Sequence, residues 1–182
     1  MSSLPVPPKL RPLVDYLNTL TSRASIERLR ELLTASHATL ADVRDFVRYE
    51  PGQYQRNLVA LSPWYEVLVI CWRSGQRSPI HNHAQSTCGL KVLRGVCSET
   101  LFAHSPCGQV VALSTSEKHE GEVCASEDDD THQVSNLQAP GDDLVTLHIY
   151  SPPLRKMKKF SITGGTEDWL PPVVEFAQGE GI

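Results

Sequence analysis

Short apolar runs separated by turn residues fill most of the chain from residue 54 onward. This pattern limits the possible folds more strongly than any other feature of the sequence. The run WYEVLVICW at 64–72 is apolar at nearly every position, as expected for a strand buried on both faces. Similar runs follow at short intervals between Gly, Pro, Asp and Ser, at residues 88–95, 96–104, 108–115, 120–126, 132–136 and 143–151. Many short strands with turns between them predict an all-β sandwich or barrel.

The N-terminal part has a helical period instead. LRPLVDYLNTL at 10–20 places apolar residues three or four positions apart. SIERLRELL at 25–33 follows, with Ser25 as a candidate N-cap. TLADVRDFV at 39–47 predicts a third short helix, with Thr39 as its candidate cap. These segments contain no residue pattern typical of a site, so we expect them to be packing structure.

The chain length of 182 residues suits one domain with a sizeable core. We therefore expect a single domain over 1–182, in which helices within 1–50 pack on a β-barrel core at 54–165. The remaining C-terminal tail is rich in Gly and Pro and predicts loop with one edge strand.

Composition argues against two classes of partner. The formal net charge is -4, and the only basic run, RKMKK at 155–159, is short and is expected to be a solvated loop. The chain thus lacks the electrostatic footprint of a nucleic-acid or anionic-membrane protein. It also lacks an apolar run long enough to cross a bilayer, and its start lacks the apolar core of a secretory signal.

These features predict a cytoplasmic protein, which we expect to be a monomer. Its five cysteines, at 71, 88, 97, 107 and 124, are odd in number and have no CxxC spacing. In a reducing compartment most of them are expected to be free thiols, and Cys71 and Cys97, inside apolar runs, to be buried small residues.

Two histidines one residue apart are the first candidate site. Side chains two apart in a strand point to the same face, so His81 and His83 are expected to project together. Two imidazoles at the mouth of a barrel would form half of a metal site. By itself the pattern is weak, because surface histidines also occur at this spacing.

The surroundings of these histidines carry a resemblance. Gly75, His81, His83 and Gly95 have the spacing of the first motif of the cupin superfamily, with Cys88 at the position that usually holds glutamate.

Downstream, Gly121, His132 and Asn136 resemble the second cupin motif, although Glu127 and Asp129 replace its proline and second glycine. The resemblance implies a small β-barrel that holds one metal through His132 and the two histidines of the first motif. The acidic run that includes Glu127 is expected to be a solvated loop.

The missing carboxylate has a physical consequence. Three neutral imidazoles leave the full dipositive charge on the metal, so such a site favours an anionic ligand, a thiolate above all. It also keeps open positions for O2. Imidazole suits Fe, Zn, Cu and Ni alike, so the residues alone leave the metal open.

The strand LVTLHIYS places Thr146, His148 and Tyr150 on one face. Such polar groups are costly in an apolar strand unless they face a wet pocket or a satisfied network. They therefore form a buried hydrogen-bond chain, an active-site relay, or both. Before the first buried strand, Arg56 is either a surface residue or a fork for a substrate carboxylate.

Five separated motifs, in order, resemble the cysteine dioxygenase family: YQRNLV, ICW, HNHAQSTCGLKVLRGVCSETLF, THQVSN and LHIYSPP. They cover the chain from about Arg48 to Pro153. In that family three histidines hold Fe(II), and cysteine binds the iron through its thiolate and amine. The resemblance implies that Arg56 binds the substrate carboxylate with Tyr54 beside it. It also implies that Tyr150 is the active-site tyrosine, with His148 behind it.

Several positions differ among members of that family. In some members a cysteine at the position of Cys88 forms a thioether with the tyrosine, which implies a Cys88–Tyr150 cross-link here. Thr146 stands where animal enzymes carry serine, and Met157 where they carry a second pocket cysteine. The segment YSPP is a candidate for a cis peptide bond at Ser151-Pro152.

The resemblance implies an Fe(II)-dependent dioxygenase that oxidises L-cysteine with O2 to cysteine sulfinic acid. One alternative is a 3-mercaptopropionate dioxygenase, although those relatives tend to have glutamine at the position of Arg56 and to lack the cross-linking cysteine. The other is a non-catalytic metal-binding cupin, which the polar face of Tyr150 and His148 argues against.

Overall fold

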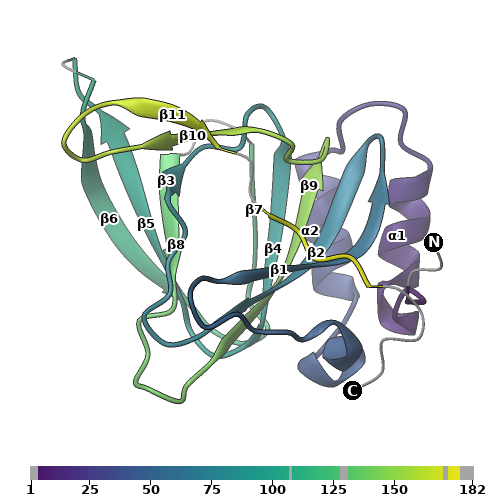
Figure 1. Cartoon of the computed structure of the whole chain (residues 1–182). Helices are drawn as coiled ribbons and strands as arrows, with labels where there is room; N and C mark the ends of the chain where they lie inside the picture. Colours follow the sequence, from purple (N-terminus) through teal and green to yellow (C-terminus); the bar gives the residue numbers. More distant parts are fainter. Residues whose placement is uncertain (1–3, 107, 128–130, 170–171, 177–182) are drawn as a thin grey trace.

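The computed structural model describes residues 4–106, 108–127, 131–169 and 172–176. It is mainly β, as expected (Figure 1). The helices are η1 (Pro8–Leu10), α1 (Arg11–Asn18), α2 (Ile26–Ala35) and η2 (Leu40–Phe46). The strands are β1 (Gln55–Ser62), β2 (Tyr65–Trp72), β3 (Ile80–His81), β4 (Thr87–Arg94), β5 (Cys97–His104), β6 (Val110–Lys118), β7 (Val123–Ser126), β8 (Thr131–Ser135), β9 (Leu144–Ser151), β10 (Met157–Phe160) and β11 (Thr166–Trp169).

The strands form two antiparallel sheets that face each other in a cupin-type barrel. One sheet has the order β1-β2-β9-β4-β7, and the other has the order β11-β10-β3-β8-β5-β6. Figure 1 shows α1 and α2 on the outer side of the five-stranded sheet. Because β2 and β9 are covered by helices on one face and by the barrel interior on the other, every residue in them is buried.

Side chains alternate between two cores across this sheet. Val145, Leu147 and Ile149 of β9 belong to the cluster packed against the helices. Leu144 and Tyr150 belong to the cluster inside the barrel. This is the two-residue period of a strand applied to a sheet with both faces covered. Cys71 and Cys97 are fully buried in these cores, as expected.

Helix α2 is fixed at its start and along its apolar face. The side chain of Ser25 accepts a hydrogen bond from the backbone N–H of Arg28, which confirms the predicted N-cap. Leu29 and Leu33 of α2 pack over Gly89 of β4. A Cβ at Gly89 would lie 2.7 Å from the Leu33 side chain, so glycine permits the close approach of helix and sheet.

The segment RKMKK is where the expected loop was wrong. Met157 begins β10 and is buried, and β10 pairs with both β3 and β11. The chain therefore uses these residues to add a hairpin to the six-stranded sheet. Lys158 and Asp168 are directly opposite in the hairpin and form an ion pair at 2.7 Å. Cross-strand charge pairing of this kind lets a charged segment form a strand.

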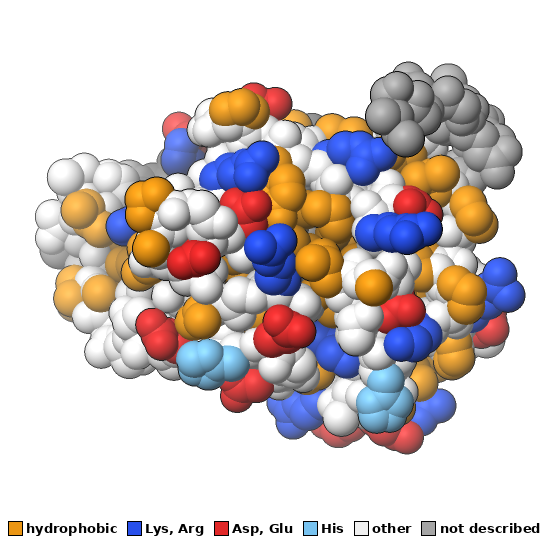
Figure 2. Space-filling view, turned by 90° about the horizontal axis from the view of Figure 1, so that it is seen from below, with side chains coloured by type: hydrophobic (Ala, Val, Ile, Leu, Met, Phe, Trp, Pro, Cys, Tyr) orange, Lys and Arg blue, Asp and Glu red, His pale blue; other side chains and the backbone are white. Residues whose placement is uncertain are grey.

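Charges of both signs are interspersed over the face shown in Figure 2. No helix in the described ranges is both long and apolar enough to span a bilayer.

We predict that Leu33→Ala lowers the free energy of unfolding by about 2–5 kcal/mol, because it removes buried methyl groups between helix and sheet. Urea unfolding followed by circular dichroism measures this loss, and we expect a single transition for helices and barrel. Leu61→Ala, at a side chain that is 42% exposed, is the control and should change the value by less than about 0.5 kcal/mol. Equal effects of the two substitutions would contradict the packing described for α2.

Candidate metal centre

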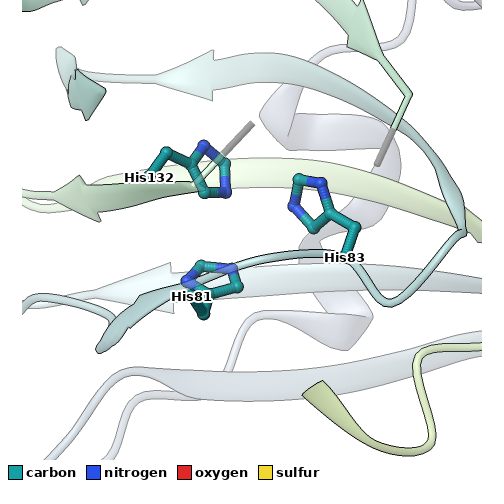
Figure 3. Close-up of side chains that lie close together, drawn as sticks. All are labelled: His81, His83 and His132. Atoms are coloured by element: carbon teal, nitrogen blue, oxygen red, sulfur yellow. The ribbon is translucent and has the colours of Figure 1, made fainter. Parts of the chain in front are cut away.

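Three histidines converge inside the barrel (Figure 3). His81 ends β3 and lies opposite His132 of β8 in the strand register. His83 follows two residues after His81, and one ring nitrogen from each residue lies within 4.8 Å of the others. All three side chains are buried. The three residues expected to bind a metal are therefore brought together.

The placement of His83 has a different cause from the one expected. Strand β3 ends at His81, so His83 lies in the turn after it rather than on the same strand face. Ala84 and Gln85 have positive φ values of 48° and 71°, and the Ser86 N–H donates to the His83 carbonyl at 2.9 Å. Non-glycine residues rarely adopt this left-handed region, so the turn stores strain while it aims His83 at the other two rings.

Hydrogen bonds fix which nitrogen of two rings faces the centre. Nδ1 of His81 lies 2.9 Å from the Pro79 carbonyl oxygen. Nδ1 of His132 lies 2.6 Å from Oε1 of Glu99. Carbonyl and carboxylate oxygens only accept, so each Nδ1 carries a proton, and Nε2 is the nitrogen left to face the centre. This is the usual state of a metal-binding histidine.

The environment of His83 fits a bound metal. Both of its ring nitrogens are buried without a hydrogen-bond partner. An unpaired buried polar group costs about 1–3 kcal/mol, and coordination of a cation would remove that penalty for one of the two nitrogens. Burial, with His132 and His81 nearby, lowers the pKa of His83 well below its usual value. Burial also lowers the pKa of His81 to about 3, so both rings are neutral at physiological pH.

Glu99 adds a carboxylate that the sequence reasoning missed. Its second oxygen accepts from the Lys118 ammonium, while the first binds His132. Burial would raise the pKa of Glu99, but the hydrogen bond from His132 and the pairing with Lys118 outweigh it and lower the pKa to about 2. The carboxylate is thus ionised. Strand alternation in CSETLF gives no sign of this contact, because it joins residues 33 positions apart.

A pocket adjoins the histidines. Its lining includes Tyr54, Arg56, Trp72, His148, Tyr150 and Met157, together with His81 and His132. Tyr54 stacks on Trp72 with ring centroids 4.3 Å apart, which gives the pocket an aromatic wall.

Arg56 is buried, so the surface alternative is wrong. Its Nη2 donates to Glu66 Oε1 at 2.9 Å, and its Nε is buried without a partner. Glu66 Oε1 also accepts from the Leu154 N–H at 3.0 Å. Burial raises the pKa of the Glu66 carboxyl even though the guanidinium lowers it. Glu66 was not foreseen, because it reads as one polar residue in an apolar run.

The polar face of β9 forms a hydrogen-bonded chain. The Trp72 Nε1–H donates to Thr146 Oγ1 at 3.0 Å, and Thr146 Oγ1 lies 2.9 Å from His148 Nε2. His148 Nδ1 lies 3.1 Å from the Tyr150 hydroxyl. Burial lowers the pKa of His148 to about 3, so the ring is neutral with one donor and one acceptor. The buried chain ends at the pocket.

Cys88 lies directly opposite Tyr150 in the β4–β9 register, and both are buried. Directly opposite side chains have Cβ atoms about 4.5–5.5 Å apart. Burial raises the pKa of the Cys88 thiol and of the Tyr150 phenol well above their usual values. Both groups are therefore protonated at neutral pH.

The remaining expectations are met in part. The Ser151-Pro152 bond is cis, as foreseen. Glu127 is exposed and pairs with Arg23 at 3.4 Å, as expected for a solvated loop, whereas Asp129 and the rest of that acidic run lie outside the described residues. Cys107 also lies outside them.

A two-sheet barrel with three buried, converging histidines defines a cupin with a metal centre. The family model for Cysteine dioxygenase type I matches residues 5–163. The chain belongs to this family.

Two relatives agree in sequence with that membership. Cysteine dioxygenase type 1 of Bos taurus is 31% identical over 154 residues, which cover 80% of this chain and 76% of the relative. The Danio rerio protein of the same name is 30% identical over 168 residues, covering 85% and 80%. A solved Klebsiella pneumoniae protein with a double-stranded beta-helix domain aligns with a TM-score of 0.49 and 18% identity, over 70% of this chain and 87% of that one.

We predict that His132→Ala and His83→Ala each remove most of the metal that purifies with the protein, because two remaining imidazoles bind a divalent ion weakly. Metal content per chain by mass spectrometry is the measurement. His119→Ala, at an exposed histidine, is the control and should retain the wild-type content. Retention of metal by the His132 variant would remove that residue from the site.

Proposed function

We propose that the protein is an Fe(II)-dependent dioxygenase that converts L-cysteine and O2 into cysteine sulfinic acid. The observation that carries this proposal is a three-histidine centre to which no carboxylate of the described residues belongs, placed beside a pocket that contains a buried arginine. Neutral ligands leave the full charge of the metal for an anionic thiolate. The arginine supplies a second positive group for the carboxylate of the same substrate.

The metal would be held by the free ring nitrogens of His81, His83 and His132. Bound Fe(II) would supply neighbouring open positions where sulfur and O2 meet, so that their reaction becomes effectively intramolecular. The product is the second step of the sulfur oxidation series, with both oxygen atoms on sulfur.

Arg56 would orient the substrate. Its Nη2 is engaged by Glu66, and its unpartnered Nε is left to donate to a carboxylate. Because Glu66 also holds the Leu154 N–H, the guanidinium is fixed in place before substrate arrives. Tyr54, stacked on Trp72, would close the pocket on that side.

Tyr150 would act next to the reacting sulfur, and His148 would position it. The neutral His148 ring connects the Tyr150 hydroxyl to Thr146 and the Trp72 indole, so the hydroxyl hydrogen is directed rather than free. When the His148 Nδ1–H donates to the phenol oxygen, the phenol hydrogen is left to donate to O2 or to the oxidised sulfur. Thr146 keeps the hydroxyl that this chain of bonds needs.

The same observations support one domain. Apolar residues of the helices within 1–50 and of the barrel at 54–165 share a single cluster, which includes Leu17, Leu29 and Val145. We propose that 1–182 folds as one cytoplasmic, monomeric unit. A sedimentation mass of one chain is the expected result, and a dimer would overturn this part.

Oxygen uptake by protein reconstituted anaerobically with Fe(II) tests the function. L-Cysteine and 3-mercaptopropionate are compared in parallel, and the product is identified by mass. Faster uptake with cysteine and formation of its sulfinate are expected. Preference for 3-mercaptopropionate would overturn the substrate but retain the reaction type. Absence of uptake with iron bound would favour a non-catalytic cupin.

We predict that Arg56→Gln lowers kcat/KM for cysteine by about 10–100-fold, because a hydrogen bond to a charged group contributes about 1.5–3 kcal/mol. The double variant Arg56→Gln/Glu66→Gln avoids leaving a buried carboxylate unpaired, and it should show the same loss. Arg73→Gln, at an exposed arginine paired with Asp143, is the control. Unchanged kinetics in the Arg56 variants would exclude this residue from substrate binding.

We predict that turnover produces a thioether between Cys88 Sγ and the ring of Tyr150. The thiol S–H and one ring C–H are lost, and two electrons and two protons pass to O2. The intact mass should fall by two hydrogens after incubation with Fe(II), cysteine and O2. Cys88→Ser should prevent the change, and Cys124→Ser should not. Full recovery of the unmodified mass after long incubation would contradict the cross-link.

A further inference from the structure

A carboxylate lies one hydrogen bond away from the proposed metal ligands. Glu99 is on β5, two residues before Leu101, which is opposite His132 in the β5–β8 register. Glu99 and His132 therefore share a face as diagonal neighbours, within reach of a long side chain. The Glu99 Oε1 to His132 Nδ1 distance is 2.6 Å.

The same carboxylate is shared with a cation. Lys118, at the end of β6, pairs with the second oxygen of Glu99. The two side chains are 17% and 18% exposed, so water screens this pair less than it would screen a surface pair. Glu99 therefore stands between His132 and Lys118, with one oxygen for each.

This arrangement bears on the charge of the centre. A carboxylate that accepts the Nδ1 proton of a metal-bound histidine makes that ring a stronger donor. A stronger donor stabilises a more highly charged ion most. A lysine paired with the same carboxylate reduces this gain in donor strength, because its positive charge competes with the histidine for the negative charge.

We propose that Glu99 is a positioning residue. Through its hydrogen bond to His132, it supplies the three-histidine centre with part of the negative charge that a carboxylate ligand would supply, and Lys118 sets how much of this charge reaches the centre. The inference rests on the proposed metal site but not on thiol oxidation. It assigns to β5 and β6 a role in the metal centre, although neither strand carries a ligand.

Two substitutions separate charge from shape. Glu99→Gln removes the charge and keeps an amide oxygen that can accept from His132 Nδ1. Lys118→Met removes the competing cation and keeps a side chain of similar length. The two substitutions should shift the properties of the metal centre in opposite directions. If either residue were merely structural, both substitutions would weaken the site through loss of packing.

The first measurement is the affinity for Co(II), determined anaerobically by competition with a chelator. Glu99→Gln should weaken binding by about 10–100-fold, and Lys118→Met should leave it unchanged or tighten it. The second is the Fe(III)/Fe(II) reduction potential, which should rise in Glu99→Gln and fall in Lys118→Met. Neither measurement requires a thiol, so a protein that fails to oxidise cysteine can still support this inference.

Matched controls isolate the local effect. Glu117→Gln changes the net charge as Glu99→Gln does, at an exposed position next to Lys118 in β6. Lys9→Met changes the net charge as Lys118→Met does, at an exposed lysine paired with Asp42. Both controls should match wild type. Circular dichroism checks that every variant is folded, and Glu99→Asp provides a second variant that keeps the charge if Glu99→Gln is unstable.

Weaker Co(II) binding and a higher potential in Glu99→Gln, with the opposite shift of potential in Lys118→Met, would support the proposal. Shifts of the same sign in both variants would overturn it, as would wild-type values in Glu99→Gln. An equal shift in Glu117→Gln would also overturn it, because the effect would then be one of overall charge.

Discussion

The register of β9 between β2 and β4 is the constraint on which both the core and the site depend. Every residue of β9 is buried, so each side chain must lie either against the helices or inside the barrel. A shift of one residue would turn Thr146, His148 and Tyr150 toward the helices and bring apolar side chains into the pocket. The register also sets Cys88 opposite Tyr150. One strand pairing thus determines packing, the hydrogen-bonded chain and the cysteine–tyrosine pair together.

The sequence predicted the elements that have a local signature. Apolar runs gave most strands, and polar alternation in β9 gave the pocket face. The resemblance to a family, carried by five motifs, gave the three histidines and Arg56. His83 was placed correctly for a wrong reason, because the positive φ values at Ala84 and Gln85 that aim it have no signature in non-glycine residues.

The partners of the site residues were not predictable. Glu66 interrupts a run that was expected to be buried on both faces, and Glu99 occupies a strand position where a solvated carboxylate is equally plausible. The sequence names no partner for either residue, and only the three-dimensional fold brings them to Arg56 and His132. Strand β10 was missed because clustered lysines are typical of loops, whereas β11 is the edge strand expected in the Gly-rich tail, and it supplies the acidic residue opposite the lysines. The charges of Arg56 and Glu99 are each paired, and their partners lie 10 and 33 positions away along the chain.

The turn after His81 has a thermodynamic consequence. Left-handed backbone at two non-glycine residues and two buried ring nitrogens without partners both raise the free energy of the folded chain when no cation is held. A cation that binds the native centre and not the unfolded chain offsets these terms by mass action. The abundance of folded protein in a cell would then follow the supply of the metal, which links the persistence of the protein to the same ion as its chemistry.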